Sequence, residues 1–233
     1  MAILSNGFFR SGFYARAYRK LLHTIYVNDL WLDLRLHAKR EAVDYIIANM
    51  GEAMVLSDRY DLLKFAFARA PKDGLVVEFG VAKGASLRLL ASLTDRTVHG
   101  FDSFGGLPED WAGTKEQTGA FTARGKLPKV PSNVELHPGW FDRTLPGFTA
   151  ANPGPCAFVH VDCDIYTSTV TIFEALHGRI QPGTVIVFDE YFNYPGWRGH
   201  EYKAFQEFIK GAGLSYRYIG FSGEKGHVAV AIV

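Results

Sequence analysis

The chain has 233 residues, of which 48% are hydrophobic and 21% charged, and its 25 basic residues balance 24 acidic ones. This composition excludes a disordered or collagen-like chain, and the lack of a basic excess argues against a dedicated nucleic-acid binder. No run of roughly 18 apolar residues and no signal-peptide pattern is found, so we expect neither a membrane span nor a secretory leader. We divide the chain into an extension over 1–56 and a larger domain over 57–233.

The N-terminal extension is predicted to be helical. The stretch Arg10 to Lys20 carries four basic residues and no acid, interleaved with aromatic residues. Such a segment fits a helix packed on the domain or on a second subunit, or one that docks on a membrane surface or partner. Helical spacing of apolar residues over 36–50 predicts a second helix that Gly51 ends, and Ser57 is expected to cap a helix over 58–70. A homo-oligomer would form through these N-terminal helices.

From residue 75, short apolar runs alternate with helical segments, which indicates a parallel sheet covered on both faces. Seven strands are predicted, near Leu75–Phe79, Thr97–Phe101, Asn133–His137, Cys156–Val161, Thr184–Phe188, Ser215–Ile219 and His227–Val233. Helices are predicted near 84–93, 140–149, 165–180 and 200–211. The last two strands are joined by a segment too short for a helical crossover, so they should be antiparallel neighbours. We therefore expect an α/β, doubly wound, seven-stranded and mostly parallel sheet with an antiparallel last strand, whose ligands bind at the carboxyl ends of the strands.

The two cysteines are expected to be free thiols. Cys156 and Cys163 lie on or beside one predicted strand, where seven residues span roughly 23 Å. A disulfide needs Cα atoms within about 7 Å, so these residues should not be bridged. Unpaired cysteines favour a reducing, cytoplasmic environment.

A glycine-containing turn follows the first strand of this alternating region. Glu78 to Gly84 reads ExGxxxG, which is neither the GxGxxG of dinucleotide binders nor a phosphate-binding P-loop. Asp102 ends the next strand, some 20 residues later, where an acid can accept both hydroxyls of a ribose. Asp102 alone could be a helix cap or a surface charge, but together with the turn it favours an adenosine-containing ligand.

Carboxylates also end two later strands. Asp162 follows one of them, and Asp189 and Glu190 follow the next. Like charges at one rim repel, so either a hard divalent cation or basic side chains such as Lys203 should neutralise them. Spacing alone does not choose between these two solutions. Strand alternation is expected to turn Asp164 away from the neighbours of Asp162.

Several strings resemble one family. Glu78–Gly84 with Asp102 resembles the S-adenosylmethionine site of class I methyltransferases, and further strings resemble the macrocin O-methyltransferase family within that class. These strings are Phe101–Pro108, Gly139–Phe141, Thr144–Pro146, Val161–Thr169 and Phe188–Tyr191. The resemblance spans roughly residues 50–210. It implies a Rossmann-like methyltransferase domain that transfers a methyl group to a sugar hydroxyl of a natural product.

The resemblance also implies roles for single residues. The cofactor S-adenosylmethionine would be held by Glu78, Gly80, Gly84, Ser86, Asp102, Ser103, Trp140 and Phe141. Glu78 and the glycines would hold its amino acid end, Asp102 and Ser103 its ribose, and the two aromatic residues its adenine. Magnesium, or else manganese or calcium, would be ligated by Asp162, Asp189 and Glu190, and Asp162 would also act as the base.

Residues after the last of these strings are candidates for the acceptor site. Tyr191, Asn193 and Trp197 lie in a loop whose aromatic faces suit stacking on a sugar or an aromatic ring, or packing on a partner subunit. His200 could contact the substrate or lie on the surface. The long aperiodic segment 104–130 is expected to be a lid. Two alternatives stay open: a methyltransferase acting on a phenol or catechol, and an inactive binding protein of the same fold.

Overall fold

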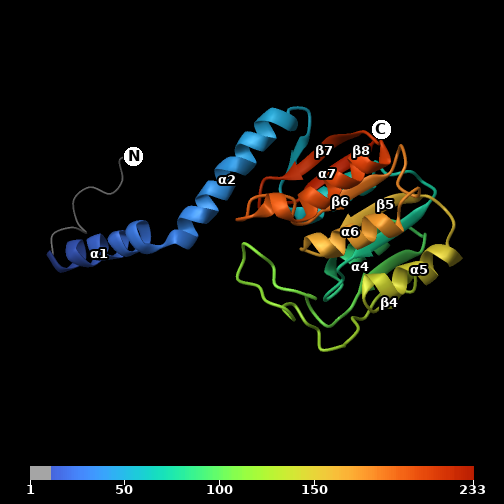
Figure 1. Cartoon of the computed structure of the whole chain (residues 1–233), viewed down its shortest axis with the longest axis horizontal. Coiled ribbons are helices and arrows are strands. Elements are labelled where there is room, and N and C mark those ends of the chain that lie inside the picture. Colours follow the sequence, from blue (N-terminus) through green and yellow to red (C-terminus); the bar gives the residue numbers. More distant parts are fainter. Residues whose placement is uncertain (1–11) are drawn as a thin grey trace.

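A computed structural model describes residues 12–233. The first eleven residues, including the start of the basic stretch at Arg10, lie outside the described part. Helix α1 (Gly12–Asn28) and helix α2 (Leu30–Asn49) meet at Asp29, whose side chain accepts a hydrogen bond from the Leu32 N–H group and caps α2. Figure 1 shows α1 and the first half of α2 standing away from the rest of the molecule. Within α2 the buried residues are Ala38 and Ala42, and its C-cap Met50 is buried too.

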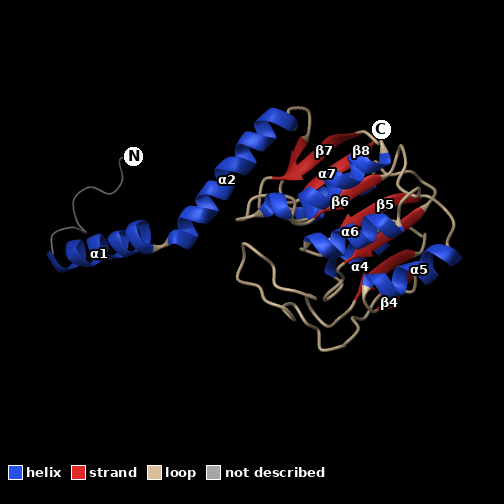
Figure 2. Ribbon diagram, viewed as in Figure 1, coloured by secondary structure: helices blue, strands red, loops and turns tan. Residues whose placement is uncertain are grey.

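The described residues form one eight-stranded sheet in the order β1-β7-β8-β6-β5-β2-β3-β4. The strands are β1 (Met54–Leu56), β2 (Leu75–Phe79), β3 (Val98–Asp102), β4 (Val134–Pro138), β5 (Cys156–Val161), β6 (Val185–Phe188), β7 (Tyr216–Ser222) and β8 (Val228–Ile232). Strand β8 runs antiparallel to both of its neighbours, and the other pairings are parallel. The predicted doubly wound sheet with a reversed last strand is confirmed (Figure 2).

The sheet has one strand more than the seven predicted. Strand β1 has three residues and pairs with β7 at the edge of the sheet. Met54 and Val55 are more than half exposed, so the strand shows no buried-exposed alternation that a sequence pattern could reveal. The proposed division after residue 56 falls directly behind this edge strand.

Helices cover both faces of the sheet. Helix α3 (Arg59–Phe67) and helix α4 (Ala85–Ser92) pack on one face, against Val76, Val98 and Phe158. Helices α5 (Phe141–Ala151), α6 (Tyr166–Ala175) and α7 (Glu201–Ala212) pack on the other, together with the end of α2 and the short 3₁₀ helix η1 (Trp197–Gly199). Alternate residues of each strand thus enter two apolar layers, as expected of a three-layer α/β domain.

Helix α3 begins one residue later than the sequence suggested. Its N-cap is Asp58, whose carboxylate accepts hydrogen bonds from the N–H groups of Tyr60 and Asp61, whereas Ser57 lies outside the helix. Asp58 caps well because its Oδ1 atom accepts from two amides that have no partner within the helix. This start places Arg59 at the first helical position, facing the site described below.

Two further expectations are met in the described residues. Cys156 and Cys163 are both buried and unbridged. None of the helices between residues 12 and 233 is long and apolar enough to cross a membrane. Between β3 and β4 the chain forms neither helix nor strand from Ser103 to Asn133, and this loop extends along one end of the sheet (green in Figure 1).

Candidate functional site

A cavity of about 970 Å³ lies at the carboxyl ends of the parallel strands. Its walls come from the turn after β2, the ends of β3, β5 and β6, the start of α5 and the loop after β3. Among the predicted site residues, the lining includes Gly80, Ser86, Asp102, Ser103, Trp140, Phe141, Asp162, Asp189 and Glu190. The cavity is therefore where an open parallel sheet is expected to bind its ligand, and it is large enough for a cofactor-sized molecule.

The turn after β2 depends on Gly80. Its φ angle is +92°, and a Cβ atom there would lie 1.6 Å from the backbone oxygen of Asp162 on the neighbouring strand end. Only glycine permits both this φ angle and this approach. Gly84 has a φ angle of +72° and forms the N-cap of α4 without lining the cavity. The two predicted glycines thus shape the turn, and only the first faces the ligand space.

Asp102 fixes the same turn. Its Oδ2 atom accepts hydrogen bonds from the N–H groups of Val81 and Ala82, at 2.9 and 2.7 Å. Its Oδ1 atom accepts from Phe104 at 2.6 Å. The carboxylate still lines the cavity beside Ser103. Asp102 is therefore placed to meet a ribose, but it also holds the cavity wall in shape.

Two aromatic residues follow β4. Trp140 is the N-cap residue of α5, lines the cavity and is 45% exposed. Phe141 lies beside it and packs edge-on against Phe79. An exposed indole at a cavity wall is suited to stack on a planar ring such as adenine.

Glu78, which was predicted to hold the amino acid end of the cofactor, lies beneath the cavity. It is fully buried and absent from the cavity wall. Its Oε1 atom accepts a hydrogen bond from Ser86, and its Oε2 atom lies 2.9 Å from His160 Nδ1. Direct contact with the cofactor's amino acid end is thus not supported, because both carboxylate oxygens have partners beneath the cavity floor.

Carboxyl groups gather at the ends of β5 and β6. Asp162, Asp164 and Glu190 bring one oxygen each to within 4.8 Å of one another. The expectation for Asp164 was wrong, because the chain leaves strand geometry after Val161 and Asp164 has a φ angle of +70°. Strand alternation no longer applies there, and the side chain turns back toward Glu190.

Arg59 neutralises part of this charge. Its guanidinium donates to Asp162 Oδ2 at 2.8 Å and lies 3.0 Å from Asp189 Oδ2. Lys203, the basic residue that the sequence analysis suggested, instead lies 3.8 Å from Glu207 on the surface of α7. Arg59 sits more than 100 residues before its partners, and no local motif pointed to it.

One arginine does not balance the cluster. Burial raises the pKa of the Asp164 carboxyl to about 7, and the charge of Asp189 adds to this shift. Burial, followed by the charge of Asp189, also raises the pKa values of Asp162 and Glu190. Glu190 Oε2 is buried without a hydrogen-bond partner among the described residues. A bound cation would relieve both the repulsion that raises these pKa values and the lack of a partner for the buried oxygen.

Glu201 connects the two strand ends from below. It is fully buried at the start of α7. Its Oε1 atom accepts hydrogen bonds from the backbone N–H groups of Cys163 and Asp164, and its Oε2 atom accepts one from the backbone N–H group of Glu190. Sequence reasoning missed it, since a lone glutamate at a helix start is an ordinary feature. Glu201 holds the backbone that carries the acidic side chains.

None of the four expected acceptor residues, Tyr191, Asn193, Trp197 and His200, lines the cavity. Tyr191 and Trp197 are buried in an aromatic cluster with Tyr45, so their faces are not open to a ligand. Asn193 donates to the backbone oxygen of Lys225. His200 is also buried, and its Nε2 atom lies 2.9 Å from the carbonyl oxygen of Ala112. These side chains serve packing and loop anchoring in the described structure.

Comparison with known proteins matches the central part of the chain. A family model described as a methyltransferase domain matches residues 77–191. The 8-demethyl-8-(2,3-dimethoxy-alpha-L-rhamnosyl)-tetracenomycin-C 4'-O-methyltransferase of Streptomyces olivaceus is 30% identical over 171 residues, covering 61% of this chain and 64% of that protein. The demethyldecarbamoylnovobiocin O-methyltransferase of Streptomyces niveus is 28% identical over 147 residues, covering 52% of this chain and 54% of that protein. The chain therefore spans less than two thirds of the length of either relative.

A solved structure extends the likeness in fold. The calicheamicin methyltransferase CalS11 superposes with a TM-score of 0.59 at 21% identity, covering 95% of this chain and 93% of that one. At this identity the match speaks for the fold alone.

Proposed function

We propose that this chain, whose residues 77–191 match a methyltransferase domain, is a class I, S-adenosylmethionine-dependent O-methyltransferase that acts on a sugar hydroxyl of a glycosylated natural product. The observation that carries the proposal is the joint wall of the cavity, where the turn after β2, Asp102 and Trp140 face an acidic cluster. The relatives support the acceptor class, since the name of one includes a rhamnosyl group and both are O-methyltransferases.

The cofactor would lie along the turn after β2. Asp102 would accept the ribose hydroxyls, Ser103 would lie beside them, and Trp140 and Phe141 would cover the adenine. Ser86 and the backbone around Gly80 would face the amino acid end, with Glu78 holding Ser86 from beneath. Bound there, S-adenosylmethionine supplies an activated methyl group, so the protein has mainly to position the acceptor oxygen in line with it.

The acidic cluster would hold a divalent cation. Asp162, Asp189 and Glu190 remain our proposed ligands. In the structure Asp162 and Glu190 group with Asp164, whereas Asp189 groups with Asp162 and His160. The proposed ligands offer only oxygens, which suits magnesium, manganese or calcium. Such an ion lowers the pKa of a coordinated hydroxyl. Asp189 now faces Arg59, so its ligand role requires the guanidinium to give way.

Asp162 is the proposed base. It lies on the cavity wall between the glycine turn and the acidic cluster. Its pKa is raised, which suits a carboxylate that must take up a proton near neutral pH. Arg59 and Glu201 would position it, one through its carboxylate and the other through the neighbouring backbone.

The proposal is tested by measuring S-adenosylhomocysteine formation with glycosides that carry vicinal hydroxyl groups, and with catechols for comparison. We expect turnover with the glycosides, its loss in excess EDTA and its recovery on adding Mg²⁺. Turnover with catechols alone would move the acceptor to the phenolic class. Full turnover in EDTA by protein shown to be metal-free would remove the cation and leave Asp162 as a bare base.

We further propose that α1 and α2 join two copies of the chain. Apolar side chains on these helices point to solvent, among them Leu21, Val27, Leu30, Leu34 and Ile47, each at least half exposed. Monomeric proteins rarely leave so many apolar groups on one projecting element.

A further inference from the structure

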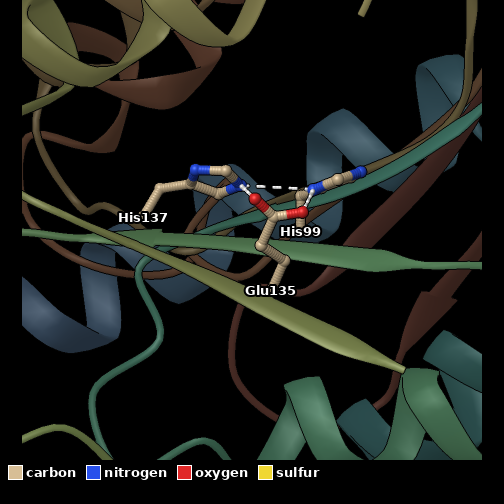
Figure 3. A group of neighbouring side chains, drawn as sticks. All are labelled: His99, Glu135 and His137. Carbon is tan, nitrogen blue, oxygen red and sulfur yellow. Dashed lines mark hydrogen bonds and ion pairs between the residues drawn. The ribbon is translucent and has the colours of Figure 1, made fainter. Parts of the chain in front are cut away.

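A second group of potential ligands lies on the edge strand β4 and its neighbour β3. His99 comes from β3, and Glu135 and His137 come from β4 (Figure 3). The parallel register pairs His99 with Glu135 and Phe101 with His137, so all three side chains share the face covered by α5. None of them lines the cavity or takes part in the proposed reaction.

The spacing of the three side chains matches a metal's coordination shell. His99 Nδ1 and His137 Nε2 are 3.2 Å apart. Two nitrogen ligands of a tetrahedral zinc ion, at bonds of about 2.05 Å, are separated by about 3.3 Å. Glu135 turns one carboxylate oxygen to each ring, at 3.6 Å from His99 and 4.0 Å from His137. All three ligand atoms lie within 4.8 Å of one another.

The two rings are held in place while the carboxylate stays movable. Phe101 stacks on His137 with ring centroids 4.3 Å apart, and Phe148 of α5 packs edge-on against both imidazoles. His99 is buried, whereas the Glu135 side chain is 61% exposed. An ion can thus enter from the solvent side, and Glu135 can close the remaining few tenths of an ångström without moving the core.

The protonation state also suits ligation. Burial lowers the pKa of both histidines, and for His99 the neighbouring His137 adds to the effect, although Glu135 opposes it. Neutral imidazoles are the form that binds a metal ion.

We propose that His99, Glu135 and His137 form a binding site for a divalent transition-metal ion such as Zn²⁺ or Co²⁺, with water completing the coordination. Two imidazoles and one carboxylate suit these metals, whereas the all-oxygen cluster in the cavity suits harder cations. A bound ion would clamp the edge strand β4 to β3, just before β4 leads into Gly139 and Trp140 at the cavity. The proposal does not depend on the function proposed above.

The test is a titration of the metal-free, full-length protein with Zn²⁺ in excess Mg²⁺, followed by Co²⁺ and its visible absorption spectrum. We expect one zinc ion per chain and the intense bands of four-coordinate cobalt. Replacing a ligand should lower zinc affinity at least about 10-fold, because even the loss of an outer-sphere partner commonly costs that much. The variants are Glu135→Gln, at an exposed position, and His137→Ala.

A matched control is His37→Ala, which removes an exposed histidine paired with a single glutamate, Glu41, at 3.9 Å. It should bind zinc like the parent protein. Methyl transfer measured with Mg²⁺ should be unchanged in Glu135→Gln, which separates this site from the active site. Zinc binding that survives both ligand variants, or that is lost instead in Asp162→Asn, would overturn the proposal.

Discussion

Asp164 illustrates how the burial of one carboxyl group makes the stability of the folded chain depend on pH. Its pKa is raised to about 7 in the folded chain from an ordinary value of 3.8, mainly by burial. The folded state therefore keeps a proton that the unfolded state releases, and stability falls as the pH rises from about 4 to about 7.

This contribution is at most on the order of 4 kcal/mol. Urea denaturation of the protein in EDTA at several pH values measures it. Asp164→Asn should flatten the profile in this pH window, because the amide stays neutral and keeps the size of the side chain. A profile that keeps its full slope in Asp164→Asn would show that other groups cause the pH dependence. Added Mg²⁺ should raise stability most at the upper end of the window in the parent protein.

Asp102 carries the next prediction. If it accepts the ribose hydroxyls, Asp102→Ala should weaken S-adenosylmethionine binding by about 10- to 100-fold, the equivalent of roughly 1.5–3 kcal/mol for charged hydrogen bonds. Titration calorimetry measures this change.

The same carboxylate also holds the turn through Val81, Ala82 and Phe104. The free energy of unfolding must therefore be measured beside affinity, and Asp102→Asn, which keeps one acceptor for the loop, serves as the comparison variant. Unchanged affinity in Asp102→Ala would place the ribose elsewhere.

At the residue scale, the carboxylates that line the cavity could be predicted from the sequence, whereas the basic residue that pairs with them could not. Asp102, Asp162, Asp189 and Glu190 were predictable because each lies at the end of a recognisable strand or within two residues of it. Arg59 was not, because an ion pair across more than 100 residues depends on how α3 is placed against β5 and β6. Tertiary burial likewise took Tyr191 and Trp197 out of the proposed acceptor site, which no local pattern reveals.

At the element scale, the backbones after β2 and β5 approach each other so closely at Gly80 and Asp162 that no side chain fits between them. Gly80→Ala should destabilise the protein by roughly 2–6 kcal/mol, because the new methyl group meets the Asp162 carbonyl and the φ angle of +92° is strained for alanine.

The matched control is Gly147→Ala. Gly147 lies on the exposed side of α5, and a Cβ atom there meets nothing within 4 Å. This change should stabilise the protein by up to about 1 kcal/mol. Thermal and urea denaturation measure both variants, and equal effects would contradict our account of the turn.

The loop after β3 carries the prediction of a lid. Its first part is anchored, since Glu109 accepts from Thr167 and the Ala112 carbonyl meets His200. Its later part includes Phe121 and Leu127, both more than half exposed. We expect hydrogen exchange over 121–124 to slow only when cofactor and acceptor are both bound, while 107–113 stays equally protected throughout. Slow exchange over 121–124 in the free protein would make the whole segment structural.

Elements were predictable where apolar periodicity was strong. The seven strands from Leu75 onward appear close to their expected bounds, and the helices between them follow. Strand β1 was missed because three half-exposed edge residues carry no periodicity. The expected apolar face of α2 is largely solvent-exposed at Val43 and Ile47, since the helix stands out from the domain.

Over the whole molecule, exposed apolar side chains are unevenly distributed. The domain over the sheet is well packed, whereas α1 and most of α2 present apolar side chains to solvent. Light scattering after size-exclusion chromatography should therefore show a dimer or larger assembly. The double substitution Leu30→Lys and Ile47→Lys should reduce its mass, because charges at two of the most exposed apolar positions oppose burial. A monomer in the parent protein would contradict the proposed role of these helices.

The central claim is that the cavity at the carboxyl ends of the strands is a cofactor site. The most direct measurement is titration calorimetry of the full-length protein with S-adenosylmethionine and with S-adenosylhomocysteine, in EDTA and again with Mg²⁺. We predict one molecule bound per chain in both conditions, since the proposed ribose and adenine contacts at Asp102 and Trp140 are separate from the acidic cluster. An absence of binding by folded protein, with or without Mg²⁺, would contradict the account.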